Sequence, residues 1–119
     1  MRITVVGIGP GSLEGMTGQA RLALEACDAI VGYTGYVDLV RPYFPDKRYH
    51  HTGMRGEEAR CREAVDLALS GRSVCVVCSG DAGVYGIAGL VLTLGQQAGI
   101  PVDVVAGVTA ASSGAALLG

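Results

Sequence analysis

The strongest constraint on the fold is a unit that recurs along the chain: an apolar run, a cluster of small residues, and then a stretch with helical periodicity. The unit begins with "RITVVGIG" at 2–9 and recurs with "RSVCVVCS" at 72–79 and "IPVDVVAG" at 100–107. Such β-branched runs predict buried strands. Because strands that alternate with helices are joined by parallel crossovers, we expect an α/β layered domain with a mostly parallel sheet flanked by helices.

Helical spacing of apolar residues marks three segments. At 17–27 the predicted inner face comprises Ala20, Ala23, Leu24 and Cys27. At 57–70, where Gly71 is expected to end the helix, it comprises Cys61, Ala64, Val65, Ala68 and Leu69. At 80–99 it comprises Ile87, Leu90, Val91 and Leu94. The remaining expectations are a strand at 28–33, a short helix at 36–44 that stops near Pro42, a loop with a short extended piece at 45–56, and a helix that starts within 109–119.

Glycines recur every third residue near the start of the long helix, at Gly83, Gly86 and Gly89. Each destabilises a helix by up to about 1 kcal/mol relative to alanine. We therefore expect another backbone or a ligand to approach closely there.

Length and charge exclude several classes of protein. The chain has 119 residues, enough for one domain, and a net charge of −2 with no tryptophan, which argues against a nucleic-acid partner. The uncharged run between Asp81 and Asp103 is interrupted by glycines, glutamines and Pro101 and lacks basic flanks, so a buried helix is favoured over a membrane span. Without a secretory signal ahead of the four cysteines, we expect a cytoplasmic, reduced protein.

Neither of the two motifs with metal-binding residue types has suitable spacing. Cys75 and Cys78 form a C-x-x-C on a predicted strand, where residues three apart point to opposite faces. His50 and His51 are adjacent, so on an extended segment they also point apart. We therefore predict no metal site.

Three small-residue loops follow predicted strands: "GIGPGS", "SGDAGVYG" and "AGVTAASS". The carboxyl ends of parallel strands meet at one edge, where open sheets bind ligands. The first loop does not match a dinucleotide fingerprint, since its third glycine comes too soon, and no Gly-Lys-Ser/Thr marks a Walker loop. Asp81 in the middle loop is either a helix cap or an acceptor for a polar ligand.

In this order, the three loops resemble the tetrapyrrole methylases, which use S-adenosylmethionine to methylate corrin precursors and related rings. Gly7, Gly9, Pro10 and Gly11 look like the family's G-x-G-P-G motif. "VGYTGYVDLV", "GMRGEEARCREAVDLALSG" and "SGDAGVYGIAGL" are most similar to the precorrin-3B C17-methyltransferase branch of cobalamin synthesis. The resemblance spans residues 2–119 and implies the first of the family's two domains, with the C-terminal domain absent from 1–119.

The resemblance also implies an S-adenosylmethionine site. Pro10 would border the cofactor, Val84 would pack on it, and the methionine part would be contacted by Ser79, Gly80 and Asp81. Thr109 and Ala110 would complete the edge. The chain has Ala106 where the family usually has proline, which makes that turn less rigid.

Residues for the tetrapyrrole substrate are less specific. Tyr33 and Tyr36 are hypotheses for ring contact, with aromatic packing of a surface loop as the alternative. Arg55 could pair with peripheral carboxylates of the ring or form an exposed salt bridge. No catalytic base is identified.

The leading hypothesis is therefore the N-terminal half of a methyltransferase that methylates a precorrin-3 type tetrapyrrole at C-17 with ring contraction, as a homodimer. One alternative is a methylase of the same fold with another substrate, such as ribosomal RNA or a modified histidine. The other is an inactive cofactor-binding or dimerisation module, which the apolar end of the sequence favours.

Overall fold

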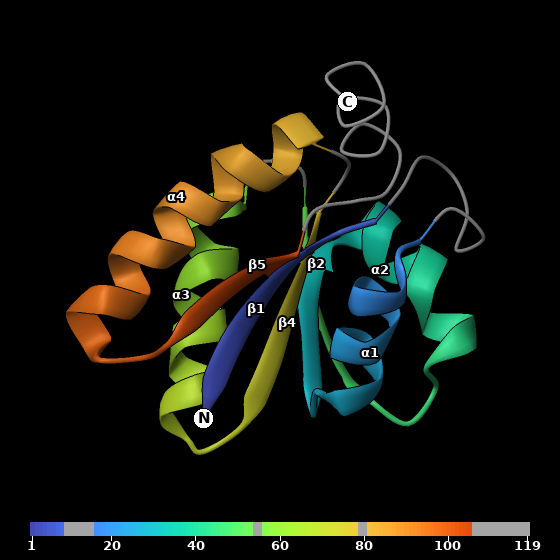
Figure 1. The fold of residues 1–119 in the computed structure, drawn as a ribbon, viewed down its shortest axis with the longest axis horizontal. Coiled ribbons are helices and arrows are strands. Elements are labelled where there is room, and N and C mark those ends of the chain that lie inside the picture. Colours follow the sequence, from blue (N-terminus) through green and yellow to red (C-terminus); the bar gives the residue numbers. More distant parts are fainter. Residues whose placement is uncertain (9–15, 54–55, 79–80, 106–119) are drawn as a thin grey trace.

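The computed structural model describes residues 1–8, 16–53, 56–78 and 81–105, with only the backbone described at 81–86. This part of the chain forms a parallel sheet between two layers of helices (Figure 1). The strands are β1 (Arg2–Gly7), β2 (Ala29–Tyr33), β3 (Arg48–Thr52), β4 (Ser73–Cys78) and β5 (Val102–Val105). The helices are α1 (Gly18–Ala26), α2 (Thr34–Val40), α3 (Glu57–Leu69) and α4 (Asp81–Ala98), with a 3₁₀ turn at Arg41–Tyr43.

All strand pairs are parallel, in the order β3-β2-β4-β1-β5. Helices α1 and α2 cover one face of the sheet, and α3 and α4 cover the other. The α/β layered class is thus confirmed. Alternate residues of each inner strand point to opposite helix layers, so β4 sends Val74 and Val76 to one core and Cys75 and Val77 to the other.

Local sequence explains the ends of two helices. The Thr17 hydroxyl accepts a hydrogen bond from the Ala20 backbone N–H at 3.0 Å, which satisfies one of the free donors of α1. Gly71 ends α3 with φ of 97°, a left-handed conformation that favours glycine. Helix α2 starts at Thr34 and stops at Val40, just before the Arg41–Tyr43 turn that contains Pro42.

The predicted inner face of α3 is correct except at Leu69. Cys61, Ala64, Val65 and Ala68 are buried, whereas Leu69 is 53% exposed and Leu67 packs against the core instead. Leu69 is the last residue of the helix and lies outside its buried face. On the exposed side of the same helix, Arg62 and Glu58, four residues apart, form an ion pair at 2.9 Å.

The extended piece expected within 45–56 is a full edge strand, β3, parallel to β2 with Ala29 opposite Arg48. Its sequence, "RYHHT", has no apolar run, because at the edge of the sheet it is only half-buried. The short extended piece predicted within 45–56 is therefore confirmed, and its pairing with β2 is what the prediction did not include.

The close approach expected along the long helix occurs at a different glycine. A Cβ on Gly89 would meet nothing within 4 Å, so no backbone of the described residues approaches it closely, and approach by a ligand stays a prediction. A Cβ on Gly95 would lie 2.6 Å from Val102 Cγ2, where α4 crosses β5. Side chains around Gly83 and Gly86 fall outside the described residues.

Candidate functional site

The carboxyl ends of β1 and β4 lie side by side. Gly7 is opposite Cys78, and the Ile8 backbone N–H donates to the Cys78 carbonyl oxygen at 2.9 Å. The chain therefore leaves these two strands from neighbouring points. These are the strands that precede the first two of the small-residue loops.

The two connections then diverge. From β1 the chain leads to α1 on one face of the sheet, and from β4 it leads to α4 on the other face (Figure 1). Strand β2, on the other side of β4, leads to α2 on the α1 face. Divergence of neighbouring connections opens a crevice outside the carboxyl ends of the strands, where open α/β sheets bind ligands.

Most of the residues predicted to bind the cofactor lie outside the described part of the chain. These are Pro10, Ser79, Gly80, Thr109 and Ala110. Asp81 and Val84 are placed by their backbone in the first turn of α4, directly after 79–80 and the end of β4. The positive end of the dipole of this 18-residue helix therefore faces the carboxyl edge of the sheet. The individual contacts predicted for these residues stay predictions.

Tyr33 and Tyr36 come together at the same edge. Tyr33 ends β2 and Tyr36 lies in the first turn of α2, and their rings meet edge-to-face with centroids 5.5 Å apart. Tyr36 also packs against the core on the α1 face. Aromatic packing therefore accounts for part of the burial of Tyr36, and ring contact by either tyrosine remains a prediction.

Arg55 lies outside the described residues, but both flanks of its loop are placed. The Gly56 N–H donates to the Gly53 carbonyl oxygen at 3.1 Å, which closes a tight turn at the end of β3. A Cβ on Gly56 would lie 2.8 Å from Thr52 Cβ and Oγ1, so this position favours glycine. The turn sits at the carboxyl edge that β2 and β4 share.

A buried arginine that the sequence analysis missed holds this turn. Arg60 is only 6% exposed, and its Nη1 donates to Thr52 Oγ1 at 2.7 Å and to the Gly53 carbonyl oxygen at 3.0 Å. Burial raises the pKa of Cys78 to about 12, and the positive charge of Arg60 acts in the opposite direction. The sequence does indicate that Arg60 lies near the core, since it precedes Ala64 by four residues and so lies beside the apolar stripe of α3.

The two cysteines of the C-x-x-C motif point to opposite faces of the sheet, as predicted, and the two adjacent histidines also point apart. Cys75 packs in the core beneath α1, and Cys78 packs in the core beneath α3 and α4. His50 Nδ1 lies 2.6 Å from Glu63 Oε1 on α3, whereas His51 Nδ1 lies 3.2 Å from the Thr34 hydroxyl on α2. Within the described ranges, no three His, Cys, Asp or Glu residues gather closely enough to hold a metal ion.

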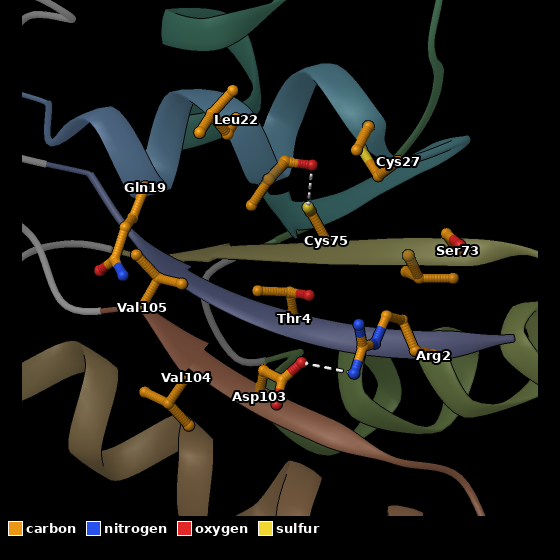
Figure 2. Close-up of a pocket in the computed structure, with 13 residues that line it drawn as sticks. Arg2, Thr4, Gln19, Leu22, Cys27, Ser73, Cys75, Asp103, Val104 and Val105 are labelled. Carbon is orange, nitrogen blue, oxygen red and sulfur yellow. Dashed lines mark hydrogen bonds and ion pairs between the residues drawn. The ribbon is translucent and has the colours of Figure 1, made fainter.

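A separate cavity of about 490 Å³ lies beneath α1, over β1, β4 and β5 (Figure 2). It is bordered by the ion pair between Arg2 and Asp103, 2.9 Å apart, and by two buried thiols, Cys27 and Cys75. Because Arg2 and Ser73, at the start of β1 and β4, are among its lining residues, it extends far from the carboxyl edge.

The parallel sheet and its diverging connections define an open α/β domain, a class in which ligands bind at the carboxyl edge of the sheet. Comparison with known proteins goes further. The chain belongs to the tetrapyrrole (corrin/porphyrin) methylase family, which it matches over residues 2–119. Methylases of this family use S-adenosylmethionine.

Individual relatives agree with this assignment. The chain is 45% identical over 119 residues to the probable cobalt-factor III C(17)-methyltransferase of Salmonella typhimurium, with 98% of this chain and 49% of the relative covered. It superposes on the crystal structure of the methyltransferase CobJ with a TM-score of 0.80 at 34% identity, covering 99% of this chain and 51% of the other.

A third relative was solved with a product of the cofactor. It is the uroporphyrin-III C-methyltransferase of Thermus thermophilus in complex with S-adenosylhomocysteine, with a TM-score of 0.73 and 27% identity over 92% of this chain and 49% of that one. The chain thus spans about half the length of each of these three relatives. In the part of the chain that the structure describes, no helix has the length and apolar character needed to cross a membrane.

Proposed function

We propose that the chain forms one half of an S-adenosylmethionine-dependent methyltransferase that methylates a precorrin-3 type tetrapyrrole at C-17, with ring contraction, in cobalamin biosynthesis. The observation that supports this most is the 45% identity, over nearly the whole chain, to a probable cobalt-factor III C(17)-methyltransferase. The placement of the glycine motifs after β1 and β4 is consistent with it.

The crevice suits an amphipathic cofactor. Ile8 and Cys78 bring two small-residue loops to adjacent points, and small residues leave backbone N–H and C=O groups accessible to polar parts of a ligand. We propose that Ser79, Gly80 and Asp81 hold the methionine part, that Pro10 and Val84 border the cofactor, and that Thr109 and Ala110 complete the edge. When bound, the cofactor supplies an electrophilic methyl group on a sulfonium.

The work of the chain is then positioning rather than covalent catalysis. An electron-rich ring carbon must lie in line with the methyl group, and such orientation supplies about 7 to 11 kcal/mol in well-ordered sites. A carboxylate at Asp81 would accept hydrogen bonds from an ammonium group and so fix the methionine end. Glycine-rich loops on a rigid parallel sheet provide this order.

We assign the tetrapyrrole to the β2 and β3 side of the edge. Tyr33 and Tyr36 present an aromatic pair there, and Arg55 belongs to the Gly53–Gly56 turn. A guanidinium pairs with carboxylates through two parallel hydrogen bonds, and the ring carries peripheral carboxylates. Ring stacking on the tyrosines and a carboxylate clamp by Arg55 are the proposed roles.

We further propose that a second domain completes the crevice, since each of the three relatives is about twice as long as this chain. A homodimer in the cytoplasm, where free thiols persist, is the proposed working state. Binding without catalysis would be expected of the half chain alone.

The test is calorimetric titration of S-adenosylhomocysteine into two proteins. One is the chain itself, and the other is the chain joined to the remaining half of the Salmonella typhimurium relative. We expect at least tenfold tighter binding by the joined protein, and methyl transfer to a precorrin-3 substrate by that protein alone.

Two matched variants of the joined protein test whether Asp81 contributes to the binding. Asp81→Asn is expected to weaken binding by about tenfold or more, since it removes a charge-assisted hydrogen bond. Asp46→Asn, an exposed aspartate in the connection from α2 to β3, should leave the affinity unchanged. Failure of both proteins to bind, or equal binding by wild type and Asp81→Asn, would refute the cofactor site, while binding without methyl transfer would favour an inactive cofactor-binding module.

A further inference from the structure

Two cysteines from different elements converge beneath α1. The Cys75 thiol, in the middle of β4, donates to the Ala23 carbonyl oxygen at 3.3 Å, and the Cys27 backbone N–H donates to the same oxygen at 3.2 Å. The Cys27 thiol donates to the next carbonyl, that of Leu24, at 3.2 Å. Figure 2 shows both side chains close to this end of α1.

The pair is within reach of small molecules. Cys27 and Cys75 are only 5% and 1% exposed, but both border the cavity of about 490 Å³ beneath α1. This volume exceeds by more than tenfold the roughly 30 Å³ that one water molecule occupies in the liquid. The cavity can therefore admit a small hydroperoxide to the side of α1 on which both thiols lie.

The surroundings make the two thiols chemically different. Interaction with the Cys75 side chain lowers the pKa of Cys27, the nearby ammonium of Lys47 acts in the same direction, and burial opposes both. Lys47 Nζ is held there by hydrogen bonds to the carbonyl oxygens of Cys27, at 2.7 Å, and of Glu25. The pKa of Cys75 is raised by its interaction with the Cys27 side chain and by burial. A thiol with a lowered pKa beside a thiol with a raised pKa is the arrangement of an attacking and a resolving cysteine.

We propose that Cys27 and Cys75 are a site of reversible oxidation that responds to hydroperoxides. The Cys27 thiolate attacks one peroxide oxygen, the O–O bond breaks, and Cys27 becomes a sulfenic acid while hydroxide leaves and takes up a proton. The Cys75 sulfur then attacks the Cys27 sulfur, its proton goes to the departing hydroxyl group, and water is released as the disulfide forms. With hydrogen peroxide, two thiols are oxidised and the peroxide is reduced to two water molecules.

The other two cysteines provide internal controls. Cys61 and Cys78 belong to the core on the opposite face of the sheet and do not border the cavity. Burial raises their pKa values, to about 11 for Cys61 and about 12 for Cys78. The pair therefore differs from the C-x-x-C of the sequence, whose cysteines belong to opposite cores.

Peptide mapping of the full chain after treatment with hydrogen peroxide tests the proposal. Free thiols are blocked with N-ethylmaleimide in denaturant, and the protein is digested without reduction. Because no lysine or arginine follows Arg72, trypsin leaves Cys75 and Cys78 in one peptide. The map is therefore repeated with Cys78→Ala, in which a cross-link to the Cys27 peptide identifies Cys75.

We expect the Cys27–Cys75 cross-link, with a mass loss of two hydrogens, in wild type and in Cys78→Ala. Cys75→Ala should instead retain a Cys27 sulfenic acid that dimedone traps, and Lys47→Met should slow the oxidation severalfold. Circular dichroism before treatment shows that each variant is folded. Absence of the cross-link in folded wild type, or a disulfide that joins Cys75 to Cys78 or involves Cys61, would overturn the proposal.

Discussion

Arg60 is the charged residue on which the geometry of the β3–α3 turn depends. Its guanidinium is buried and donates to both Thr52 and Gly53. A buried cation is tolerated only where hydrogen bonds replace its hydration. The guanidinium therefore ties the first turns of α3 to the end of β3 and fixes both flanks of the loop that contains Arg55.

Replacement of Arg60 by methionine keeps the length of the side chain and removes the donors. We expect Arg60→Met to lower the free energy of unfolding by about 1.5 to 3 kcal/mol, the usual contribution of hydrogen bonds to a charged group. The matched control is Arg62→Met on the same helix, whose exposed pair with Glu58 is worth about 0.3 to 0.5 kcal/mol. Urea denaturation of the three proteins measures the difference, and equal losses in the two variants would contradict a special role for Arg60.

Single residues also mark the limit of sequence-based prediction. The separation of Cys75 from Cys78 followed from the two-residue period of a strand, and the structure confirms it. The convergence of Cys27 with Cys75 could not be predicted, because it requires α1 to lie over β4 and so depends on the strand order. Pairs that join distant elements are set by topology rather than by local pattern.

At the scale of elements, helix α4 contains glycines in two different environments. Gly89 is exposed and has open space where a Cβ would be, while Gly95 is buried against Val102 and the Ile100 carbonyl oxygen. The sequence shows only that glycines are frequent in this helix. Which glycine is needed depends on the path of β5, which turns back past the end of α4.

These environments predict opposite effects of one substitution. Gly89→Ala is expected to raise the free energy of unfolding by up to about 1 kcal/mol, since alanine restricts the unfolded chain and favours the helix. Gly95→Ala is expected to lower it by about 1 to 3 kcal/mol, because its methyl group would lie 2.6 Å from Val102 Cγ2. Thermal unfolding of both variants measures the two changes in the free energy of unfolding. Stabilisation by Gly95→Ala would show that there is room for a methyl group between α4 and β5.

Strand β3 illustrates why the sequence predicted a short extended piece but not its place in the sheet. Buried parallel strands are recognised by continuous apolar runs, and "RYHHT" has none. Its place at the edge is set by pairing with β2 and by polar contacts: Thr34 donates to the Thr52 carbonyl oxygen at 3.2 Å, and His50 pairs with Glu63. Edge strands of this kind have a polar sequence and are predicted poorly from hydrophobic periodicity.

At the scale of the whole molecule, the strand order explains both the ligand crevice and the distribution of stability. The layered class followed from the alternation of apolar runs with helical segments, whereas the order β3-β2-β4-β1-β5 did not, since several orders satisfy the same alternation. This order places the ends of β1 and β4, from which the chain enters the glycine motifs, next to each other. It also gives β4 two paired neighbours and a helix layer on each face.

Hydrogen exchange should therefore be graded across the sheet. We expect the amides of β4 to exchange slowest, because Val74 to Val77 are at most 1% exposed and opening them requires disruption of both helix layers. Amides of β3 at one edge, half-buried, and of β5 at the other edge, with Val104 40% exposed, should exchange at least about tenfold faster. Mass spectrometry of peptides from the native protein measures this order, and exchange from the chain unfolded in denaturant corrects for intrinsic rates. Equal protection of β3 and β4 would mean that the sheet opens only as one unit, so that the edge strand is as stable as the centre.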